Sequence, residues 1–476
     1  MVFSSIYFLI YFLPFFLLIY TIIPKRFKNF FLLLASAFFY SWGGPKFIFI
    51  ILGTTFLDFF LVQQMSRSGT EKKRKLFLIL SVCLNTGILF YFKYCNFFID
   101  NLNAVSRSFG FHEIQLAKIL LPIGISFYTF ESLTYVLDVY RRVHKPLTNF
   151  WEYQLYILLF PKLIAGPIVR YHDISDQITN RFGNETNANR LAGFFRFCIG
   201  LAKKVLLANS MGQQADGIFS LNISDINTTI SWIGALAYTF QIYFDFSGYS
   251  DMAIGIGKMI GFKFPENFNN PYTSTSITDF WRRWHMTLGS WMRNYLYIPL
   301  GGNRVNSKSR LYFNLWLVFL LSGLWHGASW TFVLWGAYHG LFLVLERIFL
   351  KEMFQKIGQI PSVILTFIIV VVGWVFFRAE NIHYALRFVG KMFSFDFSQS
   401  IPFITNNDFD LLVYVALFFS FFTIPKIGQK IQEQLLVSHV EFKKNFAITI
   451  LSVILFALSL SSVTASGFNP FIYFRF

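Results

Sequence analysis

Apolar runs of about 17 to 25 residues recur along the whole chain and are separated by short polar breaks. Each run is long enough to cross a hydrocarbon core of ~30 Å as a helix. We count about eleven to thirteen such segments, with no polar stretch of ~100 residues that could form a separate soluble domain. The pattern therefore predicts an all-α, polytopic integral membrane protein, organised as one membrane domain over residues 1–476.

The regularity of the pattern changes along the chain and suggests three parts, 1–140, 141–346 and 347–476. Prolines and glycines interrupt short apolar pieces in the middle part. Broken backbone at membrane depth is tolerated only where it is buried in protein or lines a wet cavity. We therefore predict that the middle part is the functional core, with re-entrant or interfacial helices; ordinary amphipathic loops are the alternative. Further helices are predicted at 311–325, 329–346, 359–377, 408–424 and 446–463.

The basic residues provide a prediction of orientation. Lys and Arg outnumber Asp and Glu by 41 to 24, and they lie in short loops instead of on one continuous face. This placement indicates orientation signals and contacts with anionic membrane lipids, and argues against a nucleic-acid partner. Basic loops follow the first, third and fifth apolar runs, so the amino terminus is predicted outside, and so is the 325–329 connection. The first run is predicted as a retained helix instead of a signal peptide.

Composition changes the picture in two respects. The charged share of 14% is well below the ~25% that is typical of soluble domains, which excludes an ordinary soluble globule. The three cysteines show no paired metal-ligand spacing. A zinc site built from His285, His326 and Asp245 would lack a ligand pair at helical spacing, so no metal is predicted.

His326 is the most specific candidate for a catalytic residue. It lies in "LSGLWHGASWTFVLWGAYHG" (321–340), next to Trp325 and among small residues that allow close approach of helices or substrate. A neutral imidazole can accept a proton from a hydroxyl at ordinary pH. The alternative is a histidine that is merely hydrogen-bonded between helices. His339, further along the run, is predicted to be a packing residue outside the site.

A second cluster lies at 267–302 and combines aromatic, acidic and basic side chains. On one continuous helix, Trp281, Trp284 or His285, and Leu288 would share a face, and Asp279 could pair with Arg282 or Arg283. Such a surface suits an interfacial helix, and its arginines could equally bind phosphates of a cofactor. The candidate site residues of this cluster are Asp279, Trp281, Arg283, His285 and Asn294.

A third patch, at 238–262, places Asp245 and Asp251 in apolar sequence. Buried carboxylates need partners. We expect the basic cluster just downstream to supply them.

The sequence resembles the membrane-bound O-acyltransferase (MBOAT) superfamily. The likeness rests on "TDFWRRWHMTLGSWMRNYLYIPLGGNR" and "LSGLWHGASWTFVLWGAYHG", and on "MVFSSIYFLIYFLPF", "FDFSGYSDMAIGIG", "GFKFPENFNNPY" and "NPFIYFRF". It is closer to the bacterial branch that serves alginate and peptidoglycan O-acetylation. The resemblance implies that His326 is the catalytic histidine and His285 the second family-typical polar position. It also implies a ring of helices around a thin centre, with His326 where a cytosolic tunnel meets an outer funnel.

The resemblance further implies a bacterial inner-membrane enzyme that passes an acyl group from a cytosolic donor to an acceptor outside. Acetyl-CoA or another acetyl thioester is the expected donor, and a periplasmic or membrane-anchored O-acetyltransferase is the expected partner. "YIPLGGNR" resembles the acetylating proteins more than the D-alanyl transferases of teichoic acid. His326 would be the general base, Trp325 would shape the passage, Asp279, Arg283 and His285 would orient donor or imidazole, and Asn294 is a candidate oxyanion donor.

Two other classes of protein remain possible from the residues alone. In a transporter, Asp245, Asp251, Arg283 and His326 would line a proton or solute path. In a membrane scaffold for a periplasmic partner, the imidazole would not be needed. D-alanyl transfer is the alternative within the resemblance.

Overall fold

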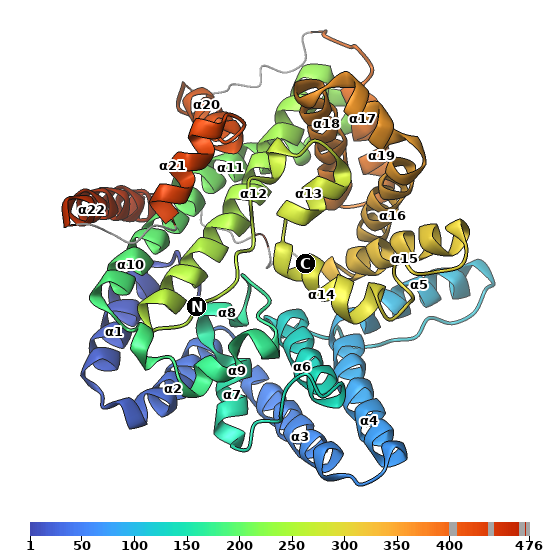
Figure 1. Cartoon of the computed structure of the whole chain (residues 1–476). Helices are drawn as coiled ribbons and strands as arrows, with labels where there is room; N and C mark the ends of the chain where they lie inside the picture. Colours follow the sequence, from blue (N-terminus) through green and yellow to red (C-terminus); the bar gives the residue numbers. More distant parts are fainter. Residues whose placement is uncertain (399–406, 437–441, 466–471, 473–476) are drawn as a thin grey trace. The chain divides into compact units, whose positions relative to one another are not determined.

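The computed structural model describes residues 1–398, 407–436, 442–465 and 472, and its secondary structure in this part of the chain is helical (Figure 1). The chain divides into two compact units, which we treat separately: unit 1 comprises residues 1–190 and 256–264, and unit 2 comprises residues 191–255 and 265–476. Whether the chain is one membrane domain with the three predicted parts stays a prediction.

Unit 1 is formed mainly by the amino-terminal helices. They are η1 (Tyr7–Phe12), α1 (Leu13–Ile22), α2 (Lys25–Gly43), α3 (Phe47–Arg67), α4 (Glu71–Leu89), η2 (Phe90–Tyr94), α5 (Cys95–Ser108), α6 (Ile125–Tyr140), α7 (Phe150–Leu158), α8 (Phe160–Leu163), α9 (Tyr171–Thr179) and η3 (Phe182–Asn184). A buried polar contact joins α3 to α4, because Asn85 donates to Asp58 at 2.6 Å. Pairing of this kind satisfies polar groups that would be costly in an apolar environment.

Unit 2 contains most of the remaining helices. They are α10 (Asn187–Ala202), η4 (Lys203–Ala208), α11 (Asn209–Phe219), η5 (Ile223–Asp225), α12 (Thr228–Met259), η6 (Pro271–Thr273), α13 (Ile277–Arg283), α14 (Met286–Trp291), η7 (Met292–Tyr297), α15 (Lys308–His326), α16 (Trp330–Leu345), η8 (Glu346–Leu350), α17 (Lys351–Ile357), α18 (Gln359–Arg378), α19 (Ile382–Met392), α20 (Asn407–Phe421), α21 (Lys426–Leu436) and α22 (Phe442–Ala465). The five helices predicted beyond residue 310 correspond to α15, α16, α18, α20 and α22, which confirms them.

Five helical stretches of the described chain are long and apolar enough to cross a membrane: 47–67, 71–108, 330–357, 359–378 and 446–465. A sixth is present if the bent pair at 409–421 and 426–433 counts as one span. Other apolar runs form shorter helices, among them 7–22 and the 16-residue α6. The count of runs in the sequence therefore exceeds the count of straight spans. The ring of helices and the tunnel stay predictions.

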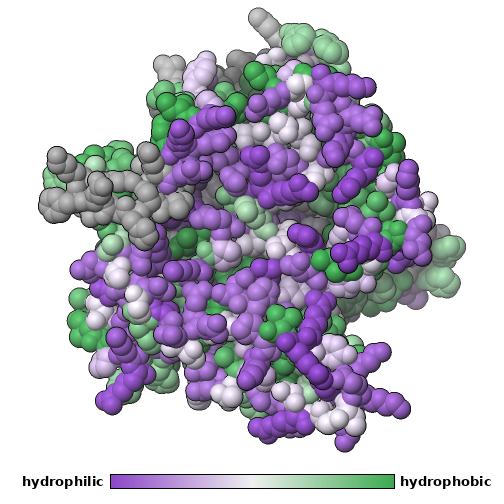
Figure 2. Space-filling view, in the orientation of Figure 1, coloured by the Kyte–Doolittle hydropathy of each residue, from purple (hydrophilic) through white to green (hydrophobic). Residues whose placement is uncertain are grey.

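Many large apolar side chains of the spans are exposed, as on a surface that faces lipid. On α3, for example, Phe49, Phe56 and Phe60 are more than half exposed. The face drawn in Figure 2 is mainly hydrophilic, with hydrophobic residues toward its margins. These exposed apolar side chains agree with the predicted class of membrane protein.

The middle part of the chain contains short helices, as predicted, but also the unbroken 32-residue helix α12. Within unit 2, α12 packs very closely against α10. A Cβ added to Gly248 would lie 2.6 Å from the carbonyl oxygen of Gly200, and one added to Gly255 would lie 2.6 Å from that of Gly193. Glycines at these positions allow the two backbones to touch. Beside the predicted short helices, this part of the chain therefore also contains one long continuous helix.

Candidate active site

The α15–α16 hairpin positions His326, which is the last residue of α15 (Figure 1). The two helices approach so closely that a Cβ added to Gly323 would lie 2.3 Å from the carbonyl oxygen of Phe332. Likewise, a Cβ added to Gly336 would lie 2.4 Å from the carbonyl oxygen of Phe319. Small residues around His326 therefore bring the helices into contact, as the sequence pattern indicates.

Aromatic rings hold the His326 imidazole on several sides. Its ring centroid lies 4.9 Å from that of Trp325, 5.2 Å from Trp335 on α16 and 5.3 Å from Phe377 on α18, each in edge-to-face geometry. The residue is 8% exposed. Since edge-to-face contacts are directional, this packing restricts the orientation of the imidazole.

His285 lies at a sharp break between α13 and α14. Its backbone is left-handed, with φ at 45°, and Trp284 before it is extended. The prediction of one continuous helix from Trp281 to Leu288 is therefore wrong. The physical reason is pairing with a distant segment: the amide of Met286 donates to the carbonyl of Asn267 at 2.9 Å, and the amide of Asn269 donates to that of Arg283 at 2.9 Å. These bonds replace helical ones and support a conformation that non-glycine residues rarely adopt.

The side chain of Asn267 also orients His285. Its Oδ1 lies 3.0 Å from Nδ1 of His285 and accepts from the hydroxyl of Thr287 at 2.9 Å, while its Nδ2 donates to Ser250 at 2.9 Å. An amide oxygen only accepts, so Nδ1 of His285 carries the hydrogen and Nε2 is the basic nitrogen. Nε2 is buried and has no hydrogen-bond partner among the described residues. Asn267 was not singled out from the sequence, although it lies in the motif "PENFNN".

The two candidate histidines lie near each other. Trp325 separates them, with ring centroids 4.9 Å from His326 and 6.3 Å from His285. The break that carries His285 is outside the candidate spans. There, burial lowers the pKa of His285 well below its ordinary value, and the His326 imidazole lowers it further. His285 is therefore neutral at pH 7, with an available basic nitrogen.

The other predicted residues of the 267–302 cluster fall into two groups. Asp279 and Arg283 form an ion pair with Nε and Oδ1 2.9 Å apart, as the four-residue spacing predicts. Trp281 contacts the rings of His339 at 4.9 Å and Trp335 at 5.5 Å. Asn294 lies on η7 and is partly exposed. Trp281 and His326 thus both contact the ring of Trp335. Asp279 and Arg283 lie on the same short helix as Trp281, α13.

The carboxylates of α12 are paired, but not with the cluster downstream. Asp245 lies 2.9 Å from Lys204 and accepts from the amide of Ile472 at 2.8 Å. Asp251 pairs with Arg196 at 2.6 Å and with Lys203 at 2.7 Å. The expected downstream partners are therefore wrong, because the packing of α10 and η4 against α12 supplies the cations. Phe246, the neighbour of Asp245 in the chain, connects this region to the candidate site, because its ring contacts His285 at 4.7 Å.

His339 is more unusual than its predicted packing role suggests. It is fully buried, and neither ring nitrogen has a hydrogen-bond partner among the described residues. Trp281 and Trp335 contact its ring, and a Cβ added to Gly373 would lie 2.5 Å from its Nε2. Because buried polar groups are nearly always paired, an imidazole packed among rings with both nitrogens unpaired is an exception in the described part of the chain.

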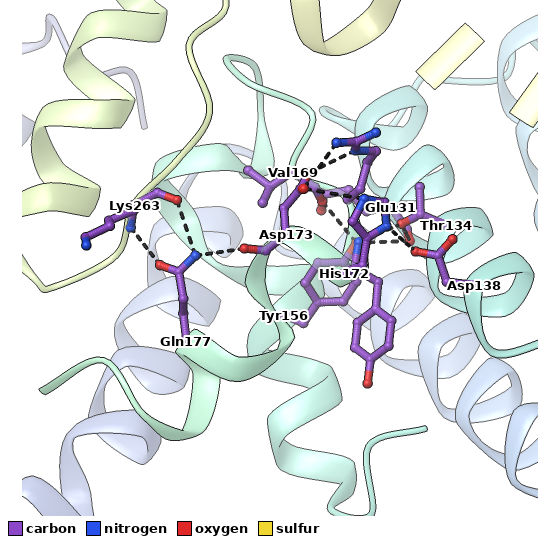
Figure 3. A network of polar contacts seen from close by, with 11 residues as sticks. Glu131, Thr134, Asp138, Tyr156, Val169, His172, Asp173, Gln177 and Lys263 are labelled. Atoms are coloured by element: carbon purple, nitrogen blue, oxygen red, sulfur yellow. Dashed lines mark hydrogen bonds and ion pairs between the residues drawn. The ribbon is translucent and has the colours of Figure 1, made fainter. Parts of the chain in front are cut away.

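A polar network in unit 1 was not predicted from the sequence (Figure 3). Its centre is the fully buried ion pair of Glu131 and Lys162. The hydroxyl of Tyr156 donates to the carbonyl of Val169 at 3.0 Å and packs beside this pair, and His172 lies 2.8 Å from Asp138. These residues are scattered in the sequence, so only folding brings them together. The pairing is not complete, because Oε1 of Glu131 has no hydrogen-bond partner among the described residues.

We expect Asn267→Ala to weaken the candidate site through His285. The change removes the acceptor of the His285 Nδ1 hydrogen and of the Thr287 hydroxyl, which should lower the free energy of unfolding by ~1–3 kcal/mol and reduce acyl transfer. Thermal unfolding and an acyl-transfer assay on the purified full chain measure both effects. Asn303→Ala is the control, since Asn303 is exposed and accepts from the Tyr297 hydroxyl at 2.7 Å outside the candidate site. Equal behaviour of the two variants would contradict a positioning role for Asn267.

The fold and the site together define an integral membrane protein in which the buried His326 ends the first helix of a hairpin and the buried His285 lies close by, an arrangement suited to proton transfer. Residues 140–379 match the MBOAT, membrane-bound O-acyltransferase family. The chain belongs to this family and is an O-acyltransferase, which confirms the resemblance seen in the sequence.

Curated relatives agree with this assignment. The probable alginate O-acetylase AlgI of Pseudomonas putida is 42% identical over 100% of both chains. The peptidoglycan O-acetyltransferase of Helicobacter pylori is 37% identical over 77% of this chain and 74% of its own. The teichoic acid D-alanyltransferase of Bacillus subtilis is 29% identical over 55% of this chain and 70% of its own.

Proposed function

We propose that this enzyme transfers an acetyl group from a cytosolic thioester donor, such as acetyl-CoA, to a hydroxyl of a polysaccharide outside the membrane. The acceptor would be alginate-like or peptidoglycan. The observation that carries the proposal is full-length similarity to a probable alginate O-acetylase, against partial similarity to a D-alanyltransferase. An inner-membrane location with the amino terminus outside, anionic lipid contacts and a periplasmic O-acetyltransferase partner belong to the same proposal.

In the proposed reaction His326 is the general base. Its neutral imidazole takes the proton of the acceptor hydroxyl as the hydroxyl oxygen attacks the thioester carbonyl. The carbon–sulfur bond then breaks, and the thiolate leaves with the proton that the imidazole returns. Rings on several sides fix the imidazole, and His285 with its unpartnered Nε2 offers a second basic nitrogen close by. Trp325, between the two histidines, would shape the passage.

The transporter hypothesis has less support from the ion pairs. Asp245, Asp251 and Arg283 each have a salt-bridge partner, so the charges expected to line a path are neutralised locally. A scaffold would not need the buried imidazole pair.

The test is to delete the gene in its own host and restore it from a plasmid. Ester-bound acetate and D-alanine are released by mild alkali from secreted polysaccharide and, separately, from peptidoglycan. We expect acetate to fall in one fraction and to return with the restored gene, while D-alanine stays constant. Loss of D-alanine instead would establish the alternative acyl group, and no change in either ester would refute the proposal.

A further inference from the structure

Arg196, on α10, binds two carboxylates that belong to different elements of unit 2. Its Nε donates to Oδ1 of Asp251, on α12, at 2.8 Å. Its Nη1 and Nη2 donate to the two carboxylate oxygens of Glu266 at 3.0 and 2.6 Å. Glu266 lies in the connecting segment between α12 and η6. The guanidinium thus uses all three of its nitrogens and joins α10, α12 and the connecting segment.

This ionic bridge lies directly beside the contacts of Asn267. Glu266 precedes Asn267 in the chain, and Ser250 precedes Asp251. The Asn267 side chain donates to the Ser250 hydroxyl at 2.9 Å. The connecting segment is therefore joined to α12 at two adjacent positions, once by this hydrogen bond and once by the bridge through Arg196. Two adjacent links fix both the place and the rotation of a segment, whereas a single hydrogen bond would let it pivot.

The bridge starts from a rigid base. The backbones of α10 and α12 touch, because a Cβ added to Gly255 would lie 2.6 Å from the carbonyl oxygen of Gly193, less than one turn before Arg196. The side chain of Arg196 is 12% exposed and that of Asp251 is 10% exposed, so water and salt screen this pair weakly. The Glu266 side chain, in contrast, is 52% exposed. Arg196 is therefore anchored at Asp251 and restrains Glu266.

Neutralising the charge of Asp251 does not by itself account for Arg196. Lys203 lies 2.7 Å from Oδ2 of Asp251, so this carboxylate would keep a cationic partner without Arg196. Within the described part of the chain, Glu266 forms its salt bridge with Arg196 alone. The planar guanidinium fork can bind two carboxylates at once, which a single ammonium group does less well. The feature that Arg196 adds is the link to Glu266.

The restrained segment in turn supports His285. Oδ1 of Asn267 lies 3.0 Å from Nδ1 of His285, and the carbonyl of Asn267 accepts from the amide of Met286 at 2.9 Å. A displacement of the segment would therefore move both the acceptor of the imidazole hydrogen and the backbone support of the break between α13 and α14. Nothing in the acyl-transfer step described above uses Arg196.

We propose that Arg196 is a positioning residue for acyl transfer. Its bridge between Asp251 and Glu266 fixes the connecting segment on α12. Through Asn267, this segment holds the His285 imidazole with its hydrogen on Nδ1 and its basic nitrogen at Nε2. The inference does not depend on which acyl group is transferred, because the imidazole would be oriented in the same way for acetate and for D-alanine.

Arg196→Lys and Glu266→Gln are the test variants. Lysine keeps a cation beside Asp251 but lacks the planar fork, and glutamine keeps the shape of Glu266 but not its charge. Each variant is restored to the deletion host, and the initial rate of ester formation on the polysaccharide is measured per amount of protein in the membrane. We expect this rate to fall roughly tenfold or more, because small displacements of positioned groups can cost ~10²-fold in rate. Arg190→Lys is the matched control and should keep the wild-type rate, since Arg190 lies on the same helix but pairs with Glu185.

A double-mutant cycle distinguishes positioning from a general structural role. If Arg196 acts through Asn267, Arg196→Lys should cause little further loss in an Asn267→Ala background, where the acceptor of the His285 hydrogen is already missing. Losses that multiply would overturn the inference. Lys203→Gln removes the other cation of Asp251 and should have a smaller effect than Arg196→Lys. An equal effect would show that charge neutralisation, and not the bridge, is what the site requires.

The tautomer of His285 provides a readout that is independent of activity. Nitrogen-15 NMR of the histidine-labelled full-length protein in nanodiscs shows which ring nitrogen carries the hydrogen, and His285→Gln assigns the signal. We expect the hydrogen on Nδ1 in the wild type and a shift toward the Nε2-protonated tautomer in Arg196→Lys. An unchanged tautomer would refute the positioning role, even in a host where the proposed acetyl ester is not found in any strain.

Discussion

Replacing His326 with Gln is expected to abolish acyl transfer while leaving the protein in the membrane at wild-type abundance. Glutamine has similar reach and retains hydrogen-bonding capacity, but it cannot accept a proton at neutral pH. General-base catalysis is worth ~10² to 10⁴ in rate, so the loss should be at least of that size. The measurement is ester-bound acetate on the polysaccharide, together with the amount of the protein in isolated membranes.

A matched control shows whether the loss of activity is specific to His326 or follows from replacing any histidine. His383, on α19, is exposed, so His383→Gln should leave both abundance and acetate unchanged. Acetate that persists in the His326→Gln strain would show that this imidazole is structural. It would also leave the family membership intact while removing the assigned base. Loss of acetate with loss of protein would indicate that the aromatic packing around His326 had failed.

The second large effect is expected from adding a single methyl group between α15 and α16. Gly336→Ala would place a Cβ 2.4 Å from the carbonyl oxygen of Phe319 and 3.1 Å from the Cα of Leu320. Both are backbone atoms, so only a shift of one helix relieves the clash. Overpacking of this kind costs ~1–3 kcal/mol. Because the hairpin holds His326 and Trp335, the shift should also reduce activity.

Thermal unfolding of the detergent-solubilised protein tests this prediction. Gly390→Ala is the control, because Gly390 is also helical but a Cβ added there meets nothing within 4 Å. Alanine is a better helix former than glycine, so this variant should be as stable as wild type or more stable by ~0.5–1 kcal/mol. We expect a lower midpoint of unfolding for Gly336→Ala alone. Equal midpoints would mean that the helices are not held at the close distance described above.

Membrane class, helical secondary structure and the position of His326 could all be predicted from the sequence. Hydrophobic length determines whether a segment can span a bilayer, and a run such as 359–377 retains this property whatever its neighbours are. The motif around His326 was recognisable because its small residues and aromatic rings are contiguous in the chain. The pairing of Asp279 with Arg283 was also predictable, since four-residue spacing brings side chains together within one helix.

Contacts between residues that are distant in the chain could not be predicted in this way. The break at His285 depends on backbone pairing with Asn267 and Asn269, so local helix preference gave the wrong result there. The partner of Asp245 is Lys204, and the place of Lys204 follows only from the packing of η4 and α10 against α12. Burial of His339 between Trp281 and Gly373 likewise requires three helices.

The sequence by itself thus determined the class of protein, the helical segments and the hairpin that carries His326, the histidine predicted to be catalytic. Those properties reside in hydrophobic length and in short contiguous motifs. Only the tertiary structure decided which nitrogen of His285 is basic, which cations neutralise the carboxylates of α12, and that Arg196 joins one of these carboxylates to Glu266. Each of these depends on distances between side chains from different helices, and such distances are set by packing, which no local pattern encodes.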